Sequence, residues 1–202
     1  MRLALMVSFL LAAGACLLFF FSFEKRKPSV KDILPVVVMV AVASAGRVLF
    51  NFLPQIQPVT AIVMIMGIYC GGRTGFLTGA MSALASNLFL GQGPWTPFQM
   101  LAWGLIGVLA AVLAKAPVFR KIGAVCVYGF LAGFLYGLIT DLWTLMAMGE
   151  SLSWTLVLTV YAAAVPFNLL HGVGNVVFLL LLYRPLGKKL ERIQEKFGVL
   201  AS

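Results

Sequence analysis

The arrangement of this chain is decided by the stretch QPVTAIVMIMGIYCGGRTGFLTGAMSALASNLFL, residues Gln57–Leu90. It contains two apolar segments, Gln57–Cys70 and Gly75–Leu90, which are separated by a short turn with two glycines and Arg73. Both segments are short for a helix that crosses a ~30 Å hydrocarbon layer, which takes about 20 apolar residues. We therefore expect either two compact transmembrane helices or a re-entrant pair. Both arrangements return the chain to the side from which it came.

Five more apolar segments surround this pair. Of the 202 residues, 62% are hydrophobic and only 10% are charged, whereas soluble domains are about half apolar and a quarter charged. The segments are Leu3–Phe23, Ile33–Leu53, Pro97–Ala114, Ile122–Met148 and Trp154–Tyr183. The pattern predicts an all-α integral membrane protein that lies in a lipid bilayer, because the short alternating strands of a barrel are missing from the sequence.

The basic residues predict the orientation of these segments. All but two of the 15 Lys and Arg fall in loops on the same side, and only Arg2 and Arg47 fall on the other. Because cytoplasmic loops are rich in Lys and Arg, we expect the amino terminus outside and the carboxyl terminus in the cytoplasm. The expected parts are an amino-terminal helix (1–24), a membrane core (25–187) and a cytoplasmic tail (188–202).

Several functions are disfavoured by what the sequence holds. The net charge of +9 follows mostly from topology, so we expect no nucleic-acid partner. No phosphate-binding G-x-x-x-x-G-K-[ST] motif is present. Cys16, Cys70 and Cys126 lie in separate apolar segments without metal-ligand spacing, which predicts small core residues and no metal site. We expect no catalytic residues, since Asp141 and His171 lie on different segments without a second carboxylate.

Polar and aromatic residues gather near the predicted outer ends of the segments, whereas the inner halves are almost wholly apolar. This asymmetry predicts a polar cavity that opens outward, because costly intramembrane polar groups face the bundle interior. The predicted substrate-binding residues are Arg47, Asn51, Gln57, Asn87, Gln92, Trp95, Gln99, Trp103, Asp141, Trp143, Asn168 and His171.

The roles of three of these residues stay open at this point. Arg47 and Asp141 are each about 10 Å deep at 1.5 Å per residue, so they form a buried ion pair or contact the substrate. Trp95 lies in a stiff loop, which suits either an interfacial aromatic or a preorganised ligand contact.

His171 has Asn168 at i−3 and Asn175 at i+4 on one helix face. This spacing favours hydrogen-bonded packing over contact with a ligand or a metal.

Small residues recur at a spacing of four in two segments. One row is Gly129, Gly133 and Gly137, and the other is Ala41-x-x-x-Ala45. Small residues at this spacing let helices approach closely. For the glycine row, packing inside the bundle is the favoured interpretation.

Three stretches carry a family resemblance: ASAGRVLF (43–50), PQIQPVTAIVMIMG (54–67) and GFLTGAMSALASNLFLGQGPWTPFQMLAWGLIG (75–107). They resemble the S components, the substrate-binding subunits of energy-coupling factor (ECF) vitamin transporters, over roughly residues 32–185. The resemblance implies a six-helix core with an outward-facing pocket in a bacterial plasma membrane. The additional amino-terminal helix departs from the family pattern.

The resemblance also implies partners and a division of labour. S components associate with a transmembrane T component and two cytoplasmic ATPases, and they topple in the membrane to release substrate. ATP hydrolysis then belongs to the partners, so this chain is not itself an enzyme. Ala41 and Ala45 match the contact with the T component, and loops Asn51–Gln57, Gly91–Phe98 and Gly149–Ser153 match the lid of the pocket.

The substrate is implied by the Gly-Pro-Trp-Thr-Pro loop, Gly93–Pro97, which resembles that of the cobalamin branch. Cobalamin or a precursor would then be the transported substrate, and the chain would need no cofactor of its own. Pantothenate, queuosine precursors and a pyrimidine vitamin remain alternatives. A solitary secondary carrier is a weaker alternative, because the matching broken helices of such carriers are not evident.

Overall fold

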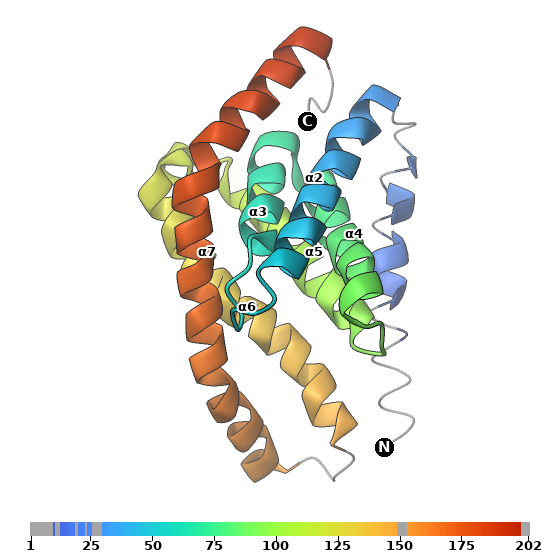
Figure 1. Cartoon of the computed structure of the whole chain (residues 1–202), viewed down its shortest axis with the longest axis vertical. Helices are drawn as coiled ribbons and strands as arrows, with labels where there is room; N and C mark the ends of the chain where they lie inside the picture. Colours follow the sequence, from blue (N-terminus) through green and yellow to red (C-terminus); the bar gives the residue numbers. More distant parts are fainter. Residues whose placement is uncertain are drawn as a thin grey trace.

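The chain forms a bundle of helices (Figure 1). The structure is a computed structural model that describes residues 10, 13–18, 20–22, 24–25, 30–148 and 153–198, the side chain of Arg120 excepted. Within these residues every regular element is helical. The elements are α2 (Val30–Leu49), α3 (Val59–Cys70), α4 (Gly72–Leu90), α5 (Thr96–Leu113), the 3₁₀ turn η1 (Pro117–Arg120), α6 (Ile122–Ala147) and α7 (Trp154–Phe197).

Helix α3 is the buried centre of the bundle. It has 12 residues, all buried except Tyr69, and it packs against α4, α5 and α7. At 1.5 Å per residue it is roughly 18 Å long, too short to cross a hydrocarbon layer alone. Gly71 at φ 88° reverses the chain directly into α4. The two short segments predicted from the sequence are thus an antiparallel pair joined by a single residue.

Three glycines allow α3, α4 and α5 to touch backbone to backbone. A Cβ at Gly75 would lie 2.8 Å from the Cα of Gly67, and one at Gly107 would lie 2.6 Å from the carbonyl carbon of Gly75. Neither approach leaves room for a methyl group. The close crossing lets the other two helices enclose α3.

The glycine row of α6 packs against α7, which confirms the prediction of internal packing. A Cβ at Gly133 would overlap the backbone of Gly172, and one at Gly137 would overlap the amide of Asn168. The third glycine, Gly129, faces a leucine side chain of α7 in the same way. The row therefore serves the α6–α7 contact and leaves no free surface for a partner.

One predicted boundary was wrong. Helix α2 ends at Leu49 and not at Leu53, because the chain turns over residues 50–55 before α3. Helix α7 continues through Pro185 and into the predicted tail (188–202) as far as Phe197. Packing holds this last part in place: Leu190 is buried, and Gln194 Nε2 donates to the carbonyl of Tyr69 at 2.8 Å.

The predicted first span, Leu3–Phe23, lies partly outside the described residues. Of the predicted lid segment Gly149–Ser153, only Ser153 is described. The described residues of Ala13–Ser22 are helical. Among them Cys16 is buried against Phe76 and Ala80 of α4. This segment therefore packs on the periphery of the bundle.

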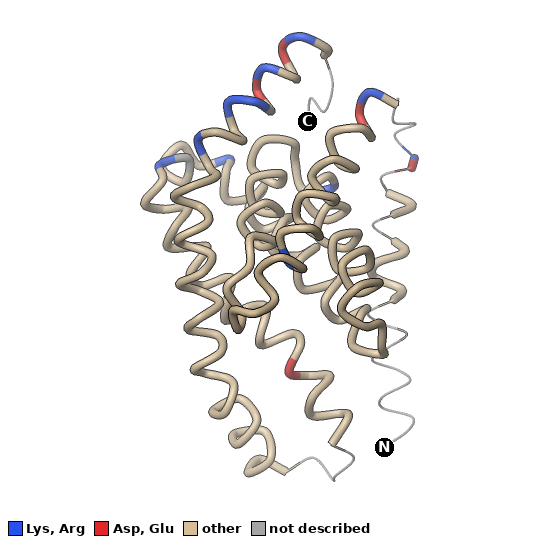
Figure 2. The backbone as a smooth tube through the Cα atoms, viewed as in Figure 1, with Lys and Arg blue, Asp and Glu red and all other residues tan. Residues whose placement is uncertain are grey.

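The helices suit a membrane. Four of them, α2, α5, α6 and α7, are long and apolar enough to cross one. Figure 2 shows the basic residues gathered toward the end of the bundle where α7 finishes. Arg47 differs from these residues because it is buried in the interior.

We expect Gly107→Ala to lower the midpoint of thermal unfolding by several degrees in detergent. The added methyl group meets the backbone of Gly75, and overpacking of this kind costs about 1–3 kcal/mol. Gly123→Ala is the matched control, because nothing lies within 4 Å of a Cβ at that position. Equal midpoints for both variants would show that the crossing relaxes without cost.

Candidate ligand-binding cavity

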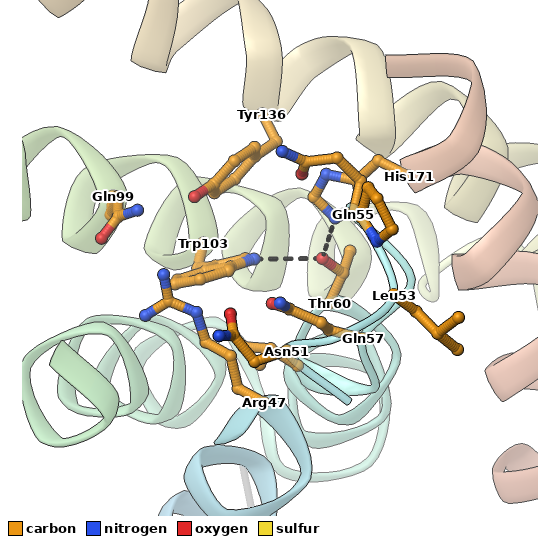
Figure 3. Close-up of a pocket in the computed structure, with 12 residues that line it drawn as sticks. Arg47, Asn51, Leu53, Gln55, Gln57, Thr60, Gln99, Trp103, Tyr136 and His171 are labelled. Atoms are coloured by element: carbon orange, nitrogen blue, oxygen red, sulfur yellow. Dashed lines mark hydrogen bonds between the residues drawn. The ribbon is translucent and has the colours of Figure 1, made fainter. Parts of the chain in front are cut away.

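A polar cavity of about 260 Å³ lies where α2, α3, α5, α6 and α7 meet (Figure 3). The loop between α2 and α3 lies over it, and this loop faces away from the basic end of the bundle (Figures 1 and 2). The cavity is lined by Arg47, Asn51, Leu53, Pro54, Gln55, Gln57, Val59, Thr60, Gln99, Trp103, Tyr136 and His171. Its lining is rich in hydrogen-bonding side chains.

Arg47 is the buried cation of this cavity. Its Nη1 donates to Ser86 Oγ and to Asn87 Oδ1, each at 2.6 Å, and its guanidinium carbon lies 5.0 Å from the ring centroid of Trp103. A charge in a membrane helix costs about 2.5–3.5 kcal/mol. Hydrogen bonds to charged groups contribute about 1.5–3 kcal/mol each, so the two bonds offset that cost without a carboxylate. The guanidinium is thus held by a hydroxyl and an amide oxygen, while its Nε has no partner among the described residues.

Asn87 connects Arg47 to the loop between α4 and α5. Its Nδ2 donates to Thr96 Oγ1 at 2.9 Å and to Gln99 Oε1 at 2.8 Å, so its amide is fully used. Thr96 in turn donates to Gln92 Oε1 at 3.0 Å. This chain of hydrogen bonds links the α4–α5 loop to the guanidinium and so fixes the position of the guanidinium.

Thr60 joins two aromatic side chains of the cavity floor. Its Oγ1 accepts from Trp103 Nε1 at 3.0 Å and lies 2.9 Å from His171 Nε2 (Figure 3). Because an indole only donates, Thr60 Oγ1 is the acceptor toward Trp103, and the imidazole tautomer sets which atom donates between Thr60 Oγ1 and His171 Nε2. The ring of Tyr136 lies 4.8 Å from the ring of Trp103 and 4.8 Å from that of His171, between centroids. The floor is thus a rigid cluster that joins α3, α5, α6 and α7.

Half of the predicted site residues line this cavity. They are Arg47, Asn51, Gln57, Gln99, Trp103 and His171.

The other predicted residues lie elsewhere. Asn87 and Gln92 hold the network behind Arg47 and do not line the cavity. Trp95 is 38% exposed outside the cavity, and Trp143 packs beside Phe98 with ring centroids 6.1 Å apart. Of these four residues, Asn87 and Gln92 support Arg47, and the two tryptophans lie outside the cavity.

Asp141 and Asn168 line a second cavity next to the first, between α6 and α7. Of the two alternatives left open for Arg47 and Asp141, the ion pair is not formed: Arg47 bonds to Ser86 and Asn87, and Asp141 Oδ2 is buried without a hydrogen-bond partner among the described residues. Similar depth in two helices does not fix the side to which each side chain points, which is why the sequence left this pair open.

The predicted amide partners of His171 also differ. Asn175 donates to the carbonyl of Gly129 at 2.9 Å, and Asn168 lies against Gly137. His171 instead reaches Thr60 on α3, as described above. Its Nδ1 has no partner among the residues that the structure describes.

Sequence reasoning missed Thr60 and Tyr136, and it placed Gln55 only within the predicted lid Asn51–Gln57. The first two are single polar groups inside apolar helical runs, and such groups in a membrane segment normally face the bundle interior. That rule alone identifies them as candidates. Gln55 takes a positive φ of 60°, which is found at no other non-glycine residue in the described part of the chain. No local sequence signal marks this conformation.

The cavity is suited to binding. It presents a fixed cation, several amides, a tyrosine and an imidazole, and no carboxylate lines it. Such a lining complements a ligand with hydrogen-bond acceptors or a negative charge. No group of three metal-ligating side chains occurs among the described residues.

Comparison with known proteins places the chain in a family. Residues 27–190 match the family of unknown function DUF6580. The chain belongs to this family. The DUF6580 match contains every residue that lines the cavity and all of α2 to α6. Neither a curated protein nor a solved structure matches the chain.

We expect Thr60→Val to destabilise the protein, because it leaves Trp103 Nε1 and His171 Nε2 buried without their partner. An unsatisfied buried group costs about 1–3 kcal/mol. Thr78→Val is the matched control: Thr78 is as buried as Thr60, but it donates only to the carbonyl of Thr74 in its own helix. Thermal unfolding in detergent measures the stability of both variants. An equal loss of stability would mean that the bonds from Thr60 to Trp103 and His171 contribute nothing beyond those of an ordinary buried threonine.

Proposed function

We propose that this protein is the substrate-binding membrane subunit of a vitamin importer of the ECF type. The observation that carries the proposal is the buried Arg47, which is fixed by Ser86 and Asn87 and has no carboxylate partner among the described residues. A cation held ready at a polar cavity is an arrangement for binding a ligand. The resemblance of residues 43–107 to S components supplies the type of transporter.

The membrane arrangement of this proposal is six crossings by α2 to α7, with α3 and α4 as a compact pair, and one more by the amino-terminal segment. The basic end of the bundle (Figure 2) then lies in the cytoplasm of a bacterial cell, as cytoplasmic loops are rich in Lys and Arg. The α2–α3 loop and the cavity then face outward, and the amino terminus is outside. Substrate would therefore enter from the external side.

The size of the cavity bears on the substrate. Its volume of about 260 Å³ lies below the usual range of ligand pockets, about 300–1,000 Å³. Cobalamin carries a corrin ring, amide arms and a nucleotide tail, and it exceeds a drug-sized ligand. A ligand held in this cavity alone would be one of the smaller alternatives, namely a queuosine precursor, a pyrimidine vitamin or pantothenate. Cobalamin stays the substrate favoured by the loop resemblance.

The partners in this proposal are a transmembrane T component and two cytoplasmic ATPases. Ala41 and Ala45 are both exposed on one face of α2, beside the exposed Val38 and Val42. Small exposed side chains in a membrane helix permit close approach by a partner helix. The face is therefore available for the contact that the resemblance implies.

We expect Arg47→Gln to weaken ligand binding about 10- to 150-fold, because hydrogen bonds to a charged group contribute about 1.5–3 kcal/mol. The measurement is calorimetry on the purified subunit with cobalamin, pantothenate, thiamine and queuosine precursors. Arg73→Gln is the control, since Arg73 is exposed and does not line the cavity. Unchanged affinity in Arg47→Gln would remove this cavity as the binding site.

We expect Ala41→Trp to prevent co-purification with a co-expressed T component and to leave ligand binding by the isolated subunit intact. The indole would occupy the space into which a partner helix could pack against the small side chains of Ala41 and Ala45. Val127→Trp is the control, on an exposed position of α6. Normal assembly of Ala41→Trp would place the partner contact on another face.

A further inference from the structure

A second chamber adjoins the cavity that holds Arg47. It has a volume of about 400 Å³ and lies between the carboxyl-terminal half of α6 and the amino-terminal half of α7. Gln55 and Tyr136 line both chambers, so these side chains form the boundary between the two spaces. A ligand that passes Gln55 and Tyr136 would touch both.

The second chamber contains one carboxylate, that of Asp141. The residue is half-buried, and its Oδ2 has no hydrogen-bond partner among the described residues. Three nearby hydroxyl groups do not serve it, because each of the three donates to a main-chain carbonyl. Thr140 donates to Tyr136 at 3.0 Å, Thr159 to Thr155 at 2.8 Å and Tyr161 to Leu138 at 3.0 Å. The carboxylate is therefore left for a group that the fold does not supply.

The walls around Asp141 leave room for that group. Ala163 and Ala164 line the chamber with only a methyl group each. The buried cation Arg47 lines the first chamber, where it donates hydrogen bonds to Ser86 and Asn87. Positive charge and negative charge thus remain apart, one in each chamber.

We propose that the ligand carries a basic nitrogen, which Asp141 binds in the second chamber while the acceptor-bearing part of the same ligand lies beside Arg47. This proposal rests on the binding function proposed above and narrows its substrate class to compounds with a protonated amine. A single carboxylate matches one positive charge. A metal ion would need further ligands, and no group of three metal-ligating side chains exists among the described residues.

The smaller substrate alternatives supply paired probes in which a neutral group replaces the aminomethyl nitrogen or the whole aminomethyl group. One pair is the aminomethyl and cyano forms of 7-deazaguanine, and the other is the aminomethyl and hydroxymethyl forms of 4-amino-2-methylpyrimidine. The full chain is purified in detergent, and the dissociation constant of each compound is measured by calorimetry. In at least one pair, we expect the amine to bind about tenfold tighter or more than its neutral partner, as a charge-assisted hydrogen bond implies.

Asp141→Asn then tests the residue itself. Because asparagine has nearly the same shape, we expect it to remove the preference for the amine and to leave the affinity of the neutral compound unchanged. Retained binding of the neutral compound also shows that the variant is folded. Asp32→Asn is the control, because it removes a carboxylate at the other end of the bundle, in the first turn of α2.

The other outcomes separate this proposal from the proposed function. Equal affinities within both pairs, or a preference that survives in Asp141→Asn, would overturn the role of Asp141. Binding of cobalamin or pantothenate in an Arg47-dependent manner, without binding of the four probes, would overturn the amine class and keep the binding subunit. Absence of any Arg47-dependent binding would overturn both.

Discussion

The backbone contact of α3, α4 and α5 at Gly67, Gly75 and Gly107 is the constraint on which the bundle depends. Because these helices meet without side chains between them, a helix of only 12 residues is enclosed on all sides. Enclosure of α3 brings Thr60, near its first turn, within hydrogen-bond distance of Trp103 and His171. A helix kept further away by larger side chains would leave these polar groups without partners. The floor of the cavity is therefore a consequence of the glycine crossing.

The polar interior is stable because its hydrogen bonds form a chain and not because charges pair. From Gln92 in the α4–α5 loop, bonds run through Thr96 and Asn87 to Arg47. Each of these bonds joins one member to the next, while Arg47 Nε is buried without a partner among the described residues. The network uses the carbonyl oxygens of amides and a hydroxyl group to hold a cation, so the charge of the guanidinium is not neutralised. This feature separates a binding cavity from a structural ion pair.

Gln55 and Tyr136 form the boundary between two chambers of different character. One holds a cation among amides, and the other holds a carboxylate among small and apolar side chains. A membrane makes such a separation costly, and no ion pair between Arg47 and Asp141 removes it. A ligand with both an acceptor group and an amine would satisfy both chambers at once. The proposed ligand is therefore defined by these two chemical groups.

The sequence by itself determined the all-helical class, the apolar segments, the glycine row of α6, and a polar set that included half of the cavity lining. These follow from composition and from helical spacing, which are local properties. Tertiary structure alone decided that Arg47 bonds to Ser86 and Asn87, that Asp141 lies in a separate chamber, and that α7 continues to Phe197. Residues such as Thr60 and His171 are 111 positions apart. Their contact depends on how the helices rotate and cross, and no short stretch of sequence specifies that.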